Sequence, residues 1–458
     1  MTSSASATRT DPIGEPTLQA AFEAARARTS NERFVLIQLP VTPGDAEALV
    51  DLDRETAVTY WAEPAGYEYV GLGALRTLSG SGPERFREIS SGAQALFTEL
   101  GSAAPRVRLF GGFAFQPRRA AGPEWVSFGE ARFVLPRVAY ERRGDTAHLS
   151  LLLTADEVAS PGAAEAGLQL AERVRVALHA ASGSEAVSLE RASLEERPDA
   201  DFLQLVDNIN AAITRGEFEK IVLARRVTLA LQKPPLASRI ERRLADIAPE
   251  CLRFAFRAGP NTFLGATPER LVSKSGRSFE TEAVAGTIPM GEIPPGRLME
   301  SAKNRAEQAI VVRELLRAFE PIAATLDHTP TPEIHRLRHL AHLRTRIRGQ
   351  LREPLHVLDL VERLHPTPAV GGVPSAAALA WIAEHEPDER GWYAGPIGWM
   401  DHQGDGAFAV ALRSGLLQRD RATLYAGAGI VQGSDAKSEL AETRWKLKPL
   451  LGAFGVVP

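Results

Sequence analysis

The chain of 458 residues contains a single cysteine, Cys251, so it cannot form a disulfide bond within itself. This scarcity fits a reducing, cytoplasmic environment, and the surrounding ECLRFAFRAG predicts that the thiol lies inside a sheet. No stretch approaches the ~18 uninterrupted apolar residues of a membrane-spanning helix, so no membrane contact is expected. The first residues, MTSSASATRTDPIGEPT, lack the apolar core of a secretory signal. They are expected to form a loose tail, with an organelle address as the alternative.

The chain also lacks a strong net charge. Its 53 Lys and Arg residues against 57 Asp and Glu give −4 at pH 7, so no overall field attracts nucleic acid or an anionic membrane. The basic stretch HRLRHLAHLRTRIRG has no interleaved aromatic residues, and no nucleic-acid partner is expected. Clusters of His and Cys that would suit zinc are missing too. What remains is an ordinary globular composition, 44% hydrophobic and 24% charged.

Hydrophobic periodicity divides the chain into three parts. Residues 1–30 predict a flexible tail and a short helix, and residues 31–200 predict an N-terminal α+β half with the alternation of antiparallel strands. The polar SLEERPDADF marks a boundary. Residues 201–458 predict further hairpins, a long helix near 300–320 and a closing helix. Strands interspersed with helices in this way indicate the α+β class, with antiparallel sheets flanked by helices.

Three carboxylates lie on two of these helices. Glu439 and Glu442 are three residues apart near the start of the closing helix, so their side chains share one face. Glu307 lies at the edge of the apolar stripe of the earlier long helix. The simplest interpretation is a set of local pairs, Glu442 with Lys446 and Glu307 with Lys303. The alternative is a Mg²⁺ site, because that ion takes one or two carboxylates and leaves positions for water and an anionic substrate.

Other residues suggest acid–base chemistry and anion binding. Lys220 opens a predicted strand and Glu269 follows a proline in GATPERL, positions that singly fit an edge residue and a turn residue. Together they could serve as general base and general acid in a closed pocket. Arg413 is predicted in mid-strand within FAVALRSGLL, where it reaches a rim or binds a carboxylate. The small-residue segments 282–287 and 426–429 fit tight turns or backbone N–H groups that approach an anion.

An ordered set of motifs carries a family resemblance across residues 200–454. The motifs are FEKIVLARR (218–226), GATPERL (265–271), AVAGT (283–287), SAKNRAEQAIVV (301–312), HLRTRIRG (342–349), LHPTPAVGGVP (364–374), ALRSGLL (411–417) and YAGAGIVQGSDAKSELAETRWK (425–446). In this order they resemble the chorismate-utilising enzymes, which include isochorismate synthase, anthranilate synthase component I, aminodeoxychorismate synthase and salicylate synthase. The first 200 residues are similar only in GGFAF and the strand pattern.

The resemblance implies large antiparallel sheets around a deep site, with 201–458 as the chorismate-binding catalytic region. It implies Mg²⁺ as cofactor, since Glu307 and Glu442 match direct ligands and Glu439 matches a carboxylate that supports the ion through water. Lys220 matches the base that activates water for attack at C2, and Glu269 the acid that protonates the departing C4 hydroxyl. The remaining residues match family positions that contact the substrate. Arg413, together with backbone donors at Gly427 and Gly429, matches the group that receives the pyruvyl carboxylate. Gly286, Thr287 and His342 match other substrate-contacting positions.

The residue types at particular positions distinguish the branches of the family. Anthranilate synthases carry Gln where Lys220 stands, and aminodeoxychorismate synthases often carry Lys where Ala285 stands. The loop LHPTPAVGG is similar to that of isochorismate synthases, so isomerisation of chorismate to isochorismate is implied. Salicylate synthase, which goes on to eliminate pyruvate, and a non-catalytic chorismate-binding homologue are the alternatives. Asn304 and Gln308 depart from the acidic residue and the His that are common at their positions, which leaves the surroundings of the metal open.

The expected partner is therefore a small molecule, chorismate. No glutaminase subunit is expected, and the chain would be a monomer or a weak homodimer. The product could feed menaquinone or siderophore biosynthesis, and the sequence leaves both pathways open.

Overall fold

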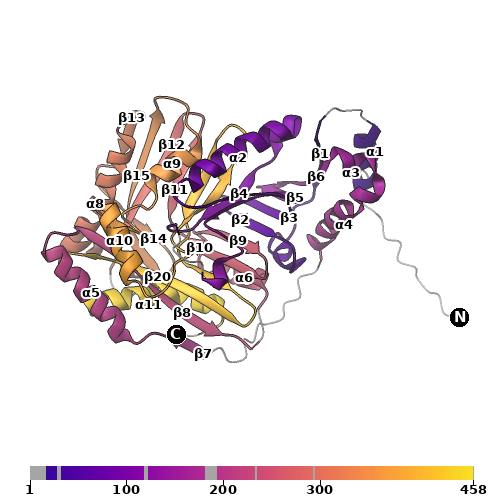
Figure 1. Ribbon diagram of the computed structural model, residues 1–458. Coiled ribbons are helices and arrows are strands. Elements are labelled where there is room, and N and C mark those ends of the chain that lie inside the picture. The colour runs from indigo at the N-terminus through magenta and orange to yellow at the C-terminus, as the bar shows by residue number, and fades with distance from the viewer. Residues whose placement is uncertain are drawn as a thin grey trace.

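The computed structural model describes residues 17–27, 32–117, 122–180, 193–232, 235–291 and 294–456 (Figure 1). The predicted N-terminal helix is α1 (Leu18–Ala27), which buries Leu18 and Phe22. The rest of the predicted tail, residues 1–16 and 28–30, lies outside the described residues. Within the described ranges, no helix is both long enough and apolar enough to cross a bilayer.

Residues 31–200 contain the antiparallel strands that the alternation predicts. The strands are β1 (Phe34–Val41), β2 (Val58–Ala62), β3 (Tyr67–Gly80), β4 (Leu109–Phe113), β5 (Ala131–Arg143), β6 (Thr146–Thr154) and β7 (Ser193–Glu196). The helices are α2 (Arg85–Leu100), α3 (Ala155–Ala159) and α4 (Pro161–Ala177), with 3₁₀ turns at Glu47–Asp51, Gly101–Arg106 and Pro123–Trp125. Strand β3 pairs with β5, β5 with β6, and β6 with β1, which makes one layer of long strands.

Residues 201–458 alternate hairpins and helices. The strands are β8 (Lys220–Ala230), β9 (Leu252–Ala258), β10 (Asn261–Thr267), β11 (Arg270–Ser275), β12 (Ser278–Pro289), β13 (Ala323–His328), β14 (Glu333–Arg336), β15 (Leu340–Leu351), β16 (Gly372–Val373), β17 (Pro396–Met400), β18 (Gly406–Val410), β19 (Ser414–Leu417) and β20 (Arg421–Val431). The helices are α5 (Asp199–Thr214), α6 (Ala237–Ile247), α7 (Arg297–Glu300), α8 (Ala302–Phe319), α9 (Val357–Leu364), α10 (Ser375–His385) and α11 (Ala436–Ala453). The basic stretch forms the end of β14 and most of β15, where exposed Arg346 and Arg348 alternate with buried Thr345 and Ile347.

Every strand pairing among the described residues is antiparallel, and the pairings join both halves of the chain. Strand β2 pairs with β9, β4 with β17, and β7 with β8. The polar segment SLEERPDADF forms β7 and the start of α5, so the first half is connected directly to the strand that Lys220 opens. The predicted class, α+β with large antiparallel sheets flanked by helices, is confirmed.

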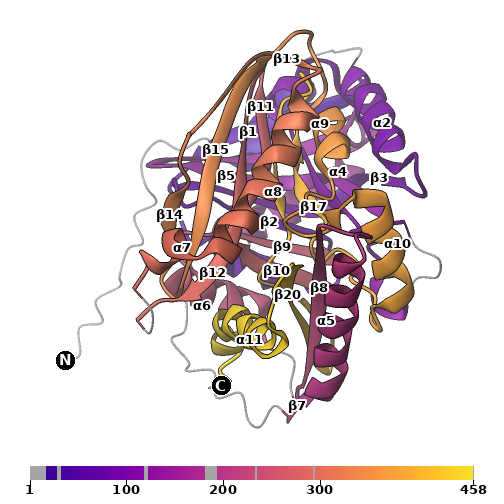
Figure 2. The same cartoon turned by 90° about the vertical axis from the view of Figure 1, so that its left-hand side faces the viewer.

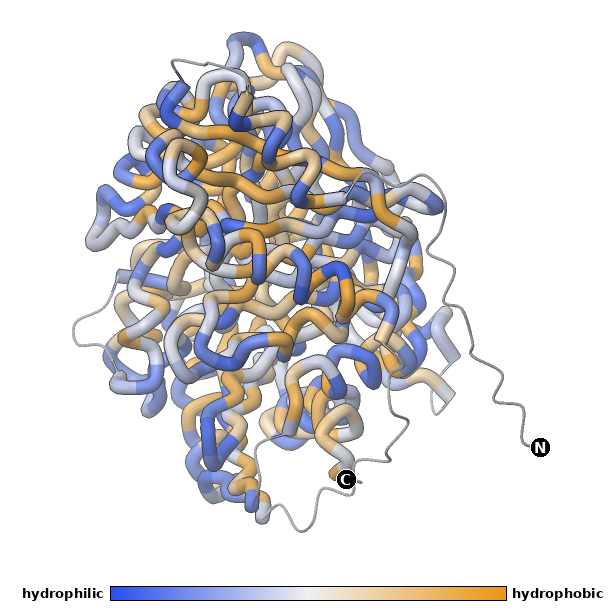
Figure 3. The backbone as a smooth tube through the Cα atoms, turned by 90° about the vertical axis from the view of Figure 1, so that its right-hand side faces the viewer, coloured by the Kyte–Doolittle hydropathy of each residue, from blue (hydrophilic) through white to orange (hydrophobic). Residues whose placement is uncertain are grey.

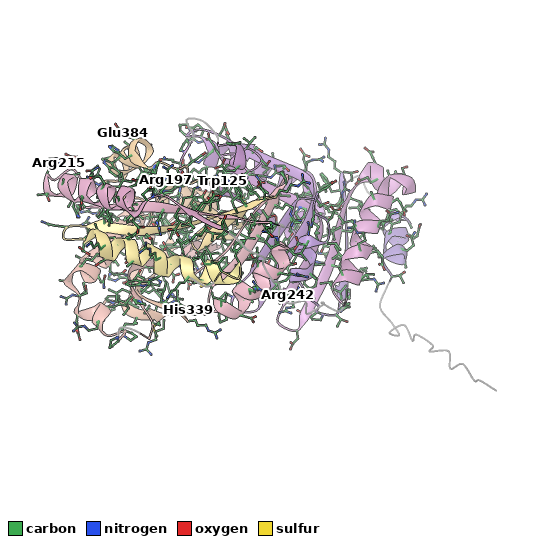
Figure 4. The ribbon with its side chains drawn as sticks, turned by 90° about the horizontal axis from the view of Figure 1, so that it is seen from below. Trp125, Arg197, Arg215, Arg242, His339 and Glu384 are labelled. Carbon is green, nitrogen blue, oxygen red and sulfur yellow. The ribbon has the colours of Figure 1, made fainter. Side chains whose placement is uncertain are left out.

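Helices cover the sheet at the end where the candidate residues lie. In Figure 2, α8 runs beside β15 and over β12, and α5 runs beside β8. From below, α5 and α11 lie side by side (Figure 4). Hydrophobic segments follow the strands through the interior, whereas hydrophilic ones concentrate in peripheral turns and helix faces (Figure 3). Cys251 is buried as predicted and immediately precedes β9.

Candidate active site

Lys220 and Glu307 form an ion pair inside the protein. Lys220 is the first residue of β8, and it is 0% exposed, so it is not the edge residue that its position alone suggests. Its Nζ lies 3.0 Å from Glu307 Oε1 on α8. Burial by itself raises the pKa of Glu307, but the ammonium groups of Lys220 and Lys303 outweigh burial and hold this pKa below its usual range. Glu307 is therefore a carboxylate held between cations.

The predicted local pair on α11 is present. Lys446 Nζ lies 2.7 Å from Glu442 Oε1, one helical turn away. The same ammonium donates a hydrogen bond to the Gly427 carbonyl at 2.7 Å, which ties α11 to β20. The side chains of Lys446 and Glu442 are only 17% and 12% exposed, so the pair faces the interior and not the solvent.

Lys303 has a different partner from the one predicted. Its Nζ lies 2.5 Å from Glu439 Oε1 on α11, whereas Glu307 is held by Lys220. The predicted Lys303–Glu307 pair is therefore wrong. Spacing along a helix indicates only which side chains can meet on that helix, and here carboxylates and ammonium groups from neighbouring elements are closer.

Three carboxylates converge around Lys303. Burial lowers the pKa of Lys303, but Glu439, Glu307 and Glu442 outweigh burial and raise this pKa. Glu439 has a raised pKa because of burial and the Glu442 charge. Its buried Oε2 makes no well-formed hydrogen bond, although Ser434 lies near enough to lower the pKa. In the described part of the chain no three acidic, His or Cys side chains form a ready-made metal site. The oxygen donors around this cation nevertheless suit Mg²⁺ chemically.

Gly427 and Gly429 direct their backbone groups away from β8. On β8, Gly427 is opposite Ala224 and Gly429 is opposite Val222. Neither N–H group of these two β8 residues donates to β20: that of Ala224 donates to a side chain outside the ladder, and that of Val222 donates to a loop carbonyl. Two residues that lie opposite each other in an antiparallel ladder either exchange two N–H···O=C hydrogen bonds or both point their N–H and C=O groups away from the partner strand. Both glycine N–H groups therefore point to the other edge of β20, where β19 no longer pairs with it. This arrangement suits backbone recognition of an anion.

Gly429 also makes room for the buried ion pair. A Cβ at this position would lie 2.3 Å from Glu307 Oε1 and 2.9 Å from Lys220 Cε. Both separations are shorter than van der Waals contact, so a side chain here would displace one partner. The glycine is required by close packing against the carboxylate.

Glu269 is placed at the predicted strand junction, between β10 and β11, and is 5% exposed. Burial and then the charge of Glu282 raise its pKa to about 8, although Lys220, Lys446 and Arg413 act in the opposite direction. At neutral pH the side chain is therefore mostly protonated. A carboxyl group that keeps its proton at this pH can donate the proton to a leaving group.

His342 on β15 connects β12 to Arg413. Its Nδ1 lies 3.1 Å from Gly286 O and 3.2 Å from Thr287 Oγ1, and its Nε2 lies 3.3 Å from Arg413 Nη2. Burial and the Arg413 charge lower the pKa of His342 well below its usual value, so the ring is neutral. Because a guanidinium only donates, Nε2 accepts and the ring proton is assigned to Nδ1. Gly286, with φ of 70°, lies at the bulge that shapes this corner.

Arg413 was predicted in mid-strand, and this prediction is wrong: the residue lies in the connection between β18 and β19. Its φ of 48° is a left-handed conformation that is rare for residues with a side chain. Ala266 N donates to Arg413 O at 3.1 Å, and Ser414 Oγ donates to Ala411 O at 2.9 Å, so both sides of the turn are held. The apolar residues on either side concealed the turn in the sequence. The side chain reaches His342 in the interior.

Two residues of α8 that depart from the family pattern pack the helix on the sheet. Gln308 donates from Nε2 to Ala283 O and to Thr345 Oγ1, each at 3.0 Å. Asn304 lies against Gly286, with its Cβ 3.0 Å from the position that a Cβ of that glycine would take. Both side chains are buried, so they fix the helix that carries Glu307.

Arg390, which is not among the residues predicted from the sequence, positions the site. It donates from Nη2 to Val222 O at 2.7 Å and from Nη1 to Val370 O at 2.8 Å, tying the 364–374 loop to the strand of Lys220. Glu386 holds the guanidinium, with Nε to Oε2 at 2.8 Å. The four-residue spacing within HEPDER was the available signal, but it indicates a helix pair and not a bridge to a distant strand.

Comparison with known proteins places this geometry in a family. The sequence matches the family model described as chorismate binding enzyme over residues 19–455. It is 34% identical to isochorismate synthase MenF of Bacillus subtilis (strain 168) over 415 residues, which cover 86% of this chain and 87% of that protein. It is 36% identical to the salicylate biosynthesis isochorismate synthase of Pseudomonas aeruginosa over 422 residues, 88% of this chain and 86% of that protein. The fold is similar to that of MenF, the menaquinone-specific isochorismate synthase from Escherichia coli, with a TM-score of 0.77 and 28% identity over 95% of this chain and 99% of that one.

The chain therefore belongs to the chorismate-binding enzyme family. Both relatives just named as isochorismate synthases match over most of its length, including the N-terminal half, where the motifs are sparse. The family resemblance inferred from the motifs is confirmed, and with it the fold.

Proposed function

We propose that the protein is an isochorismate synthase that isomerises chorismate with the help of Mg²⁺. The observation that carries the proposal is the combination of a fully buried lysine, Lys220, with a buried glutamic acid, Glu269, whose pKa is raised to about 8. Binding alone would need neither a base nor an acid. The names of the similar enzymes support the same reaction.

In the proposed reaction, Lys220 takes a proton from a water molecule as its oxygen bonds to C2 of the ring. Glu269 gives its proton to the C4 hydroxyl as the C4–O bond breaks and the double bonds shift. One water molecule enters and one leaves, so the product is an isomer. An acid and a base positioned in this way each contribute about 10²–10⁴-fold to the rate.

Lys220 can act as a base only without its extra proton. In the structure its Nζ lies 3.0 Å from Glu307 Oε1, so for catalysis this carboxylate would have to be held by another cation. Glu307 and Glu442 would hold Mg²⁺, with Glu439 supporting it. When bound, the ion would neutralise the ring carboxylate of the substrate. In the structure Lys303 is paired with Glu439 and Lys446 with Glu442, so both ammonium groups would have to leave these carboxylates for the ion to bind.

Arg413 would receive the pyruvyl carboxylate, together with the N–H groups of Gly427 and Gly429. The neutral His342 ring, fixed by Gly286, accepts from the guanidinium and keeps it aimed into the interior. A guanidinium fixed by a neutral partner retains its positive charge for the substrate.

The test is to incubate the purified protein with chorismate and Mg²⁺ and to separate the products by chromatography. Isochorismate as the main product supports the proposal, and Lys220→Ala and Glu269→Ala should then lose about 100-fold or more in turnover while remaining folded. Salicylate together with pyruvate would show a salicylate synthase instead. Tight binding of chorismate without conversion at saturating Mg²⁺ would show a non-catalytic homologue.

A further inference from the structure

Lys220 and Lys446 do not enclose Glu269 on all sides. It also lines a cavity of about 650 Å³, whose wall includes Trp61, Trp399, Glu282 and Arg344. The proposed reaction removes the proton from Glu269 once in every turnover, and the proton must return from solvent. Charged residues of this cavity wall can therefore influence the pH at which Glu269 regains its proton.

Glu282 is held next to Glu269 by the backbone. Its Oε1 accepts a hydrogen bond at 3.0 Å from the N–H of Arg270, the residue that follows Glu269. Its Oε2 lies 3.9 Å from Arg344 Nη1 on β15. The side chain is 17% exposed, so its charge is only partly screened by water. These contacts keep a negative charge beside the segment that carries the acid.

The charges that face Glu269 come from four elements. Lys220 on β8, Lys446 on α11 and Arg413 in the β18–β19 connection each favour the ionised carboxylate, and only Glu282 on β12 is prominent in the opposite sense. Burial is the largest cause of the raised pKa of Glu269, about 8, and the charge of Glu282 adds to it.

Several other charged residues of the cavity wall are paired with an opposite charge or are neutral. Lys274 Nζ lies 2.5 Å from Asp405 Oδ1, and Arg270 Nη1 lies 3.1 Å from Glu280 Oε2. Burial lowers the pKa of His335 to about 4, so this ring is neutral when the enzyme works. The remaining acidic groups of the wall are Glu63 and Glu250.

We propose that Glu282 is a positioning residue for the reaction, whose fixed carboxylate acts together with burial to keep the proton on Glu269 and thereby raises the upper pH limit of catalysis. The inference rests on the proposed function, because it assumes that Glu269 is the acid. It adds a second carboxylate, on a different strand, that touches no substrate. Without it, burial alone would oppose the three cations on the other side, and Glu269 would lose its proton at a lower pH.

The test uses Glu282→Gln in the full chain, because the amide oxygen can still accept from Arg270 N–H while the charge is removed. Glu280→Gln is the matched control: Glu280 lies two residues earlier on β12, lines the same cavity and is paired with Arg270 and Arg348, and its side chain is 43% exposed. Glu282→Asp, which keeps the charge, serves as the conservative variant. Glu269→Gln reports on the acid itself.

Two measurements are made on each variant. The first is kcat and kcat/KM for chorismate from about pH 6 to pH 10, and the second is infrared titration of the protonated carboxyl band assigned to Glu269 by its absence in Glu269→Gln. In Glu282→Gln we expect both the alkaline limb of the rate profile and the titration midpoint to move down by about one pH unit, a tenfold change in proton concentration. Glu280→Gln and Glu282→Asp should follow the wild type.

The outcomes separate this inference from the function on which it rests. An unshifted profile and titration in Glu282→Gln, with Glu269→Gln inactive, would overturn the role of Glu282 and leave the acid in place. Substantial activity in Glu269→Gln would overturn the acid assignment itself. An equal shift in Glu280→Gln would show a general effect of charge on β12 and would also reject a particular role for Glu282. The infrared titration needs no turnover, so it decides the matter even for a slow variant.

Discussion

Lys220 Nζ lies 3.0 Å from Glu307 Oε1, in a place where the lysine has no exposed surface. Gly429 is packed against both side chains, because a Cβ at this position would lie 2.3 Å from Glu307 Oε1 and 2.9 Å from Lys220 Cε. Burying two charges removes both from water, and their attraction often does no more than offset that cost. Such a pair is better explained by chemistry than by stability. In the proposed reaction it keeps a base and a metal ligand mutually neutralised until substrate and ion arrive.

This relationship predicts a strong coupling between the two residues in metal-free protein. Lys220→Met leaves the Glu307 carboxylate buried without its main cation, and we expect a loss of about 3–5 kcal/mol in the free energy of unfolding. Lys220→Met combined with Glu307→Gln should recover most of that loss, because no isolated charge remains. Denaturant unfolding in EDTA of the wild type, both single variants and the double variant measures the coupling energy. Additive effects of the two substitutions would show that the pair is not energetically coupled.

A second prediction concerns the two glycines of β20. Gly429→Ala places a methyl group 2.3 Å from Glu307 Oε1, so the carboxylate must move and we expect turnover to fall about 100-fold or more. Gly427→Ala meets its nearest neighbour, the Tyr393 hydroxyl, at 3.1 Å, a contact that a small shift can relieve. It should lose much less activity. Steady-state kinetics on both variants, with circular dichroism to confirm folding, tests the difference, and equal losses would contradict the packing argument.

Glu269 predicts the direction in which rate and stability change with pH. Catalysis needs the protonated acid, so kcat/KM should fall about tenfold per pH unit above about pH 8. The folded-state pKa of Glu269 is raised above the ordinary value of 4.5, so the folded protein holds a proton that the unfolded chain has lost. Stability from this group is complete below about pH 4.5 and is lost as the pH rises through about 8, by roughly 5 kcal/mol.

Glu269→Gln isolates that contribution. The amide does not titrate, so the free energy of unfolding of this variant should decline less than that of the wild type between pH 5 and pH 9. Chemical denaturation at a series of pH values measures both curves. Parallel curves would mean that Glu269 is already ionised in the folded protein at neutral pH, and the acid role would then be untenable.

The sequence predicted the elements of this site better than their contacts. Alternation and caps located Lys220 at a strand start, Glu269 at a strand junction and Glu442 beside Lys446, because each of these features depends on nearby residues. The partner of Glu307 was wrong because its nearest cation comes from a strand far away in the chain. Local periodicity contains no information on which elements become neighbours.

Arg413 and Arg390 illustrate two other limits. Apolar residues flank Arg413 on both sides, so the hydrophobic pattern resembles a continuous strand, whereas the backbone turns there with φ of 48°. Arg390 bridges a loop and a strand through main-chain carbonyls, which any sequence supplies at every position. Arg413 lies within ALRSGLL, one of the motifs that carry the family resemblance, whereas Arg390 lies in the interval 375–410, which no motif covers.

Lys303 provides a prediction about metal binding that does not depend on turnover. Its ammonium lies 2.5 Å from Glu439 Oε1, so a Mg²⁺ ion would compete with this ammonium for the carboxylate. In Lys303→Met the carboxylates of Glu439 and Glu442 repel each other without a cation, so Mg²⁺ should bind at least about tenfold more tightly and raise the melting temperature by more than in the wild type. Lys437→Met, an exposed lysine on the same helix as Glu439, removes the same charge at a distance and is the control. Isothermal titration with Mg²⁺ alone and thermal unfolding in EDTA or Mg²⁺ make the comparison. If Lys303→Met binds Mg²⁺ no better than Lys437→Met does, the ion does not replace the ammonium, and the three glutamates are not its site.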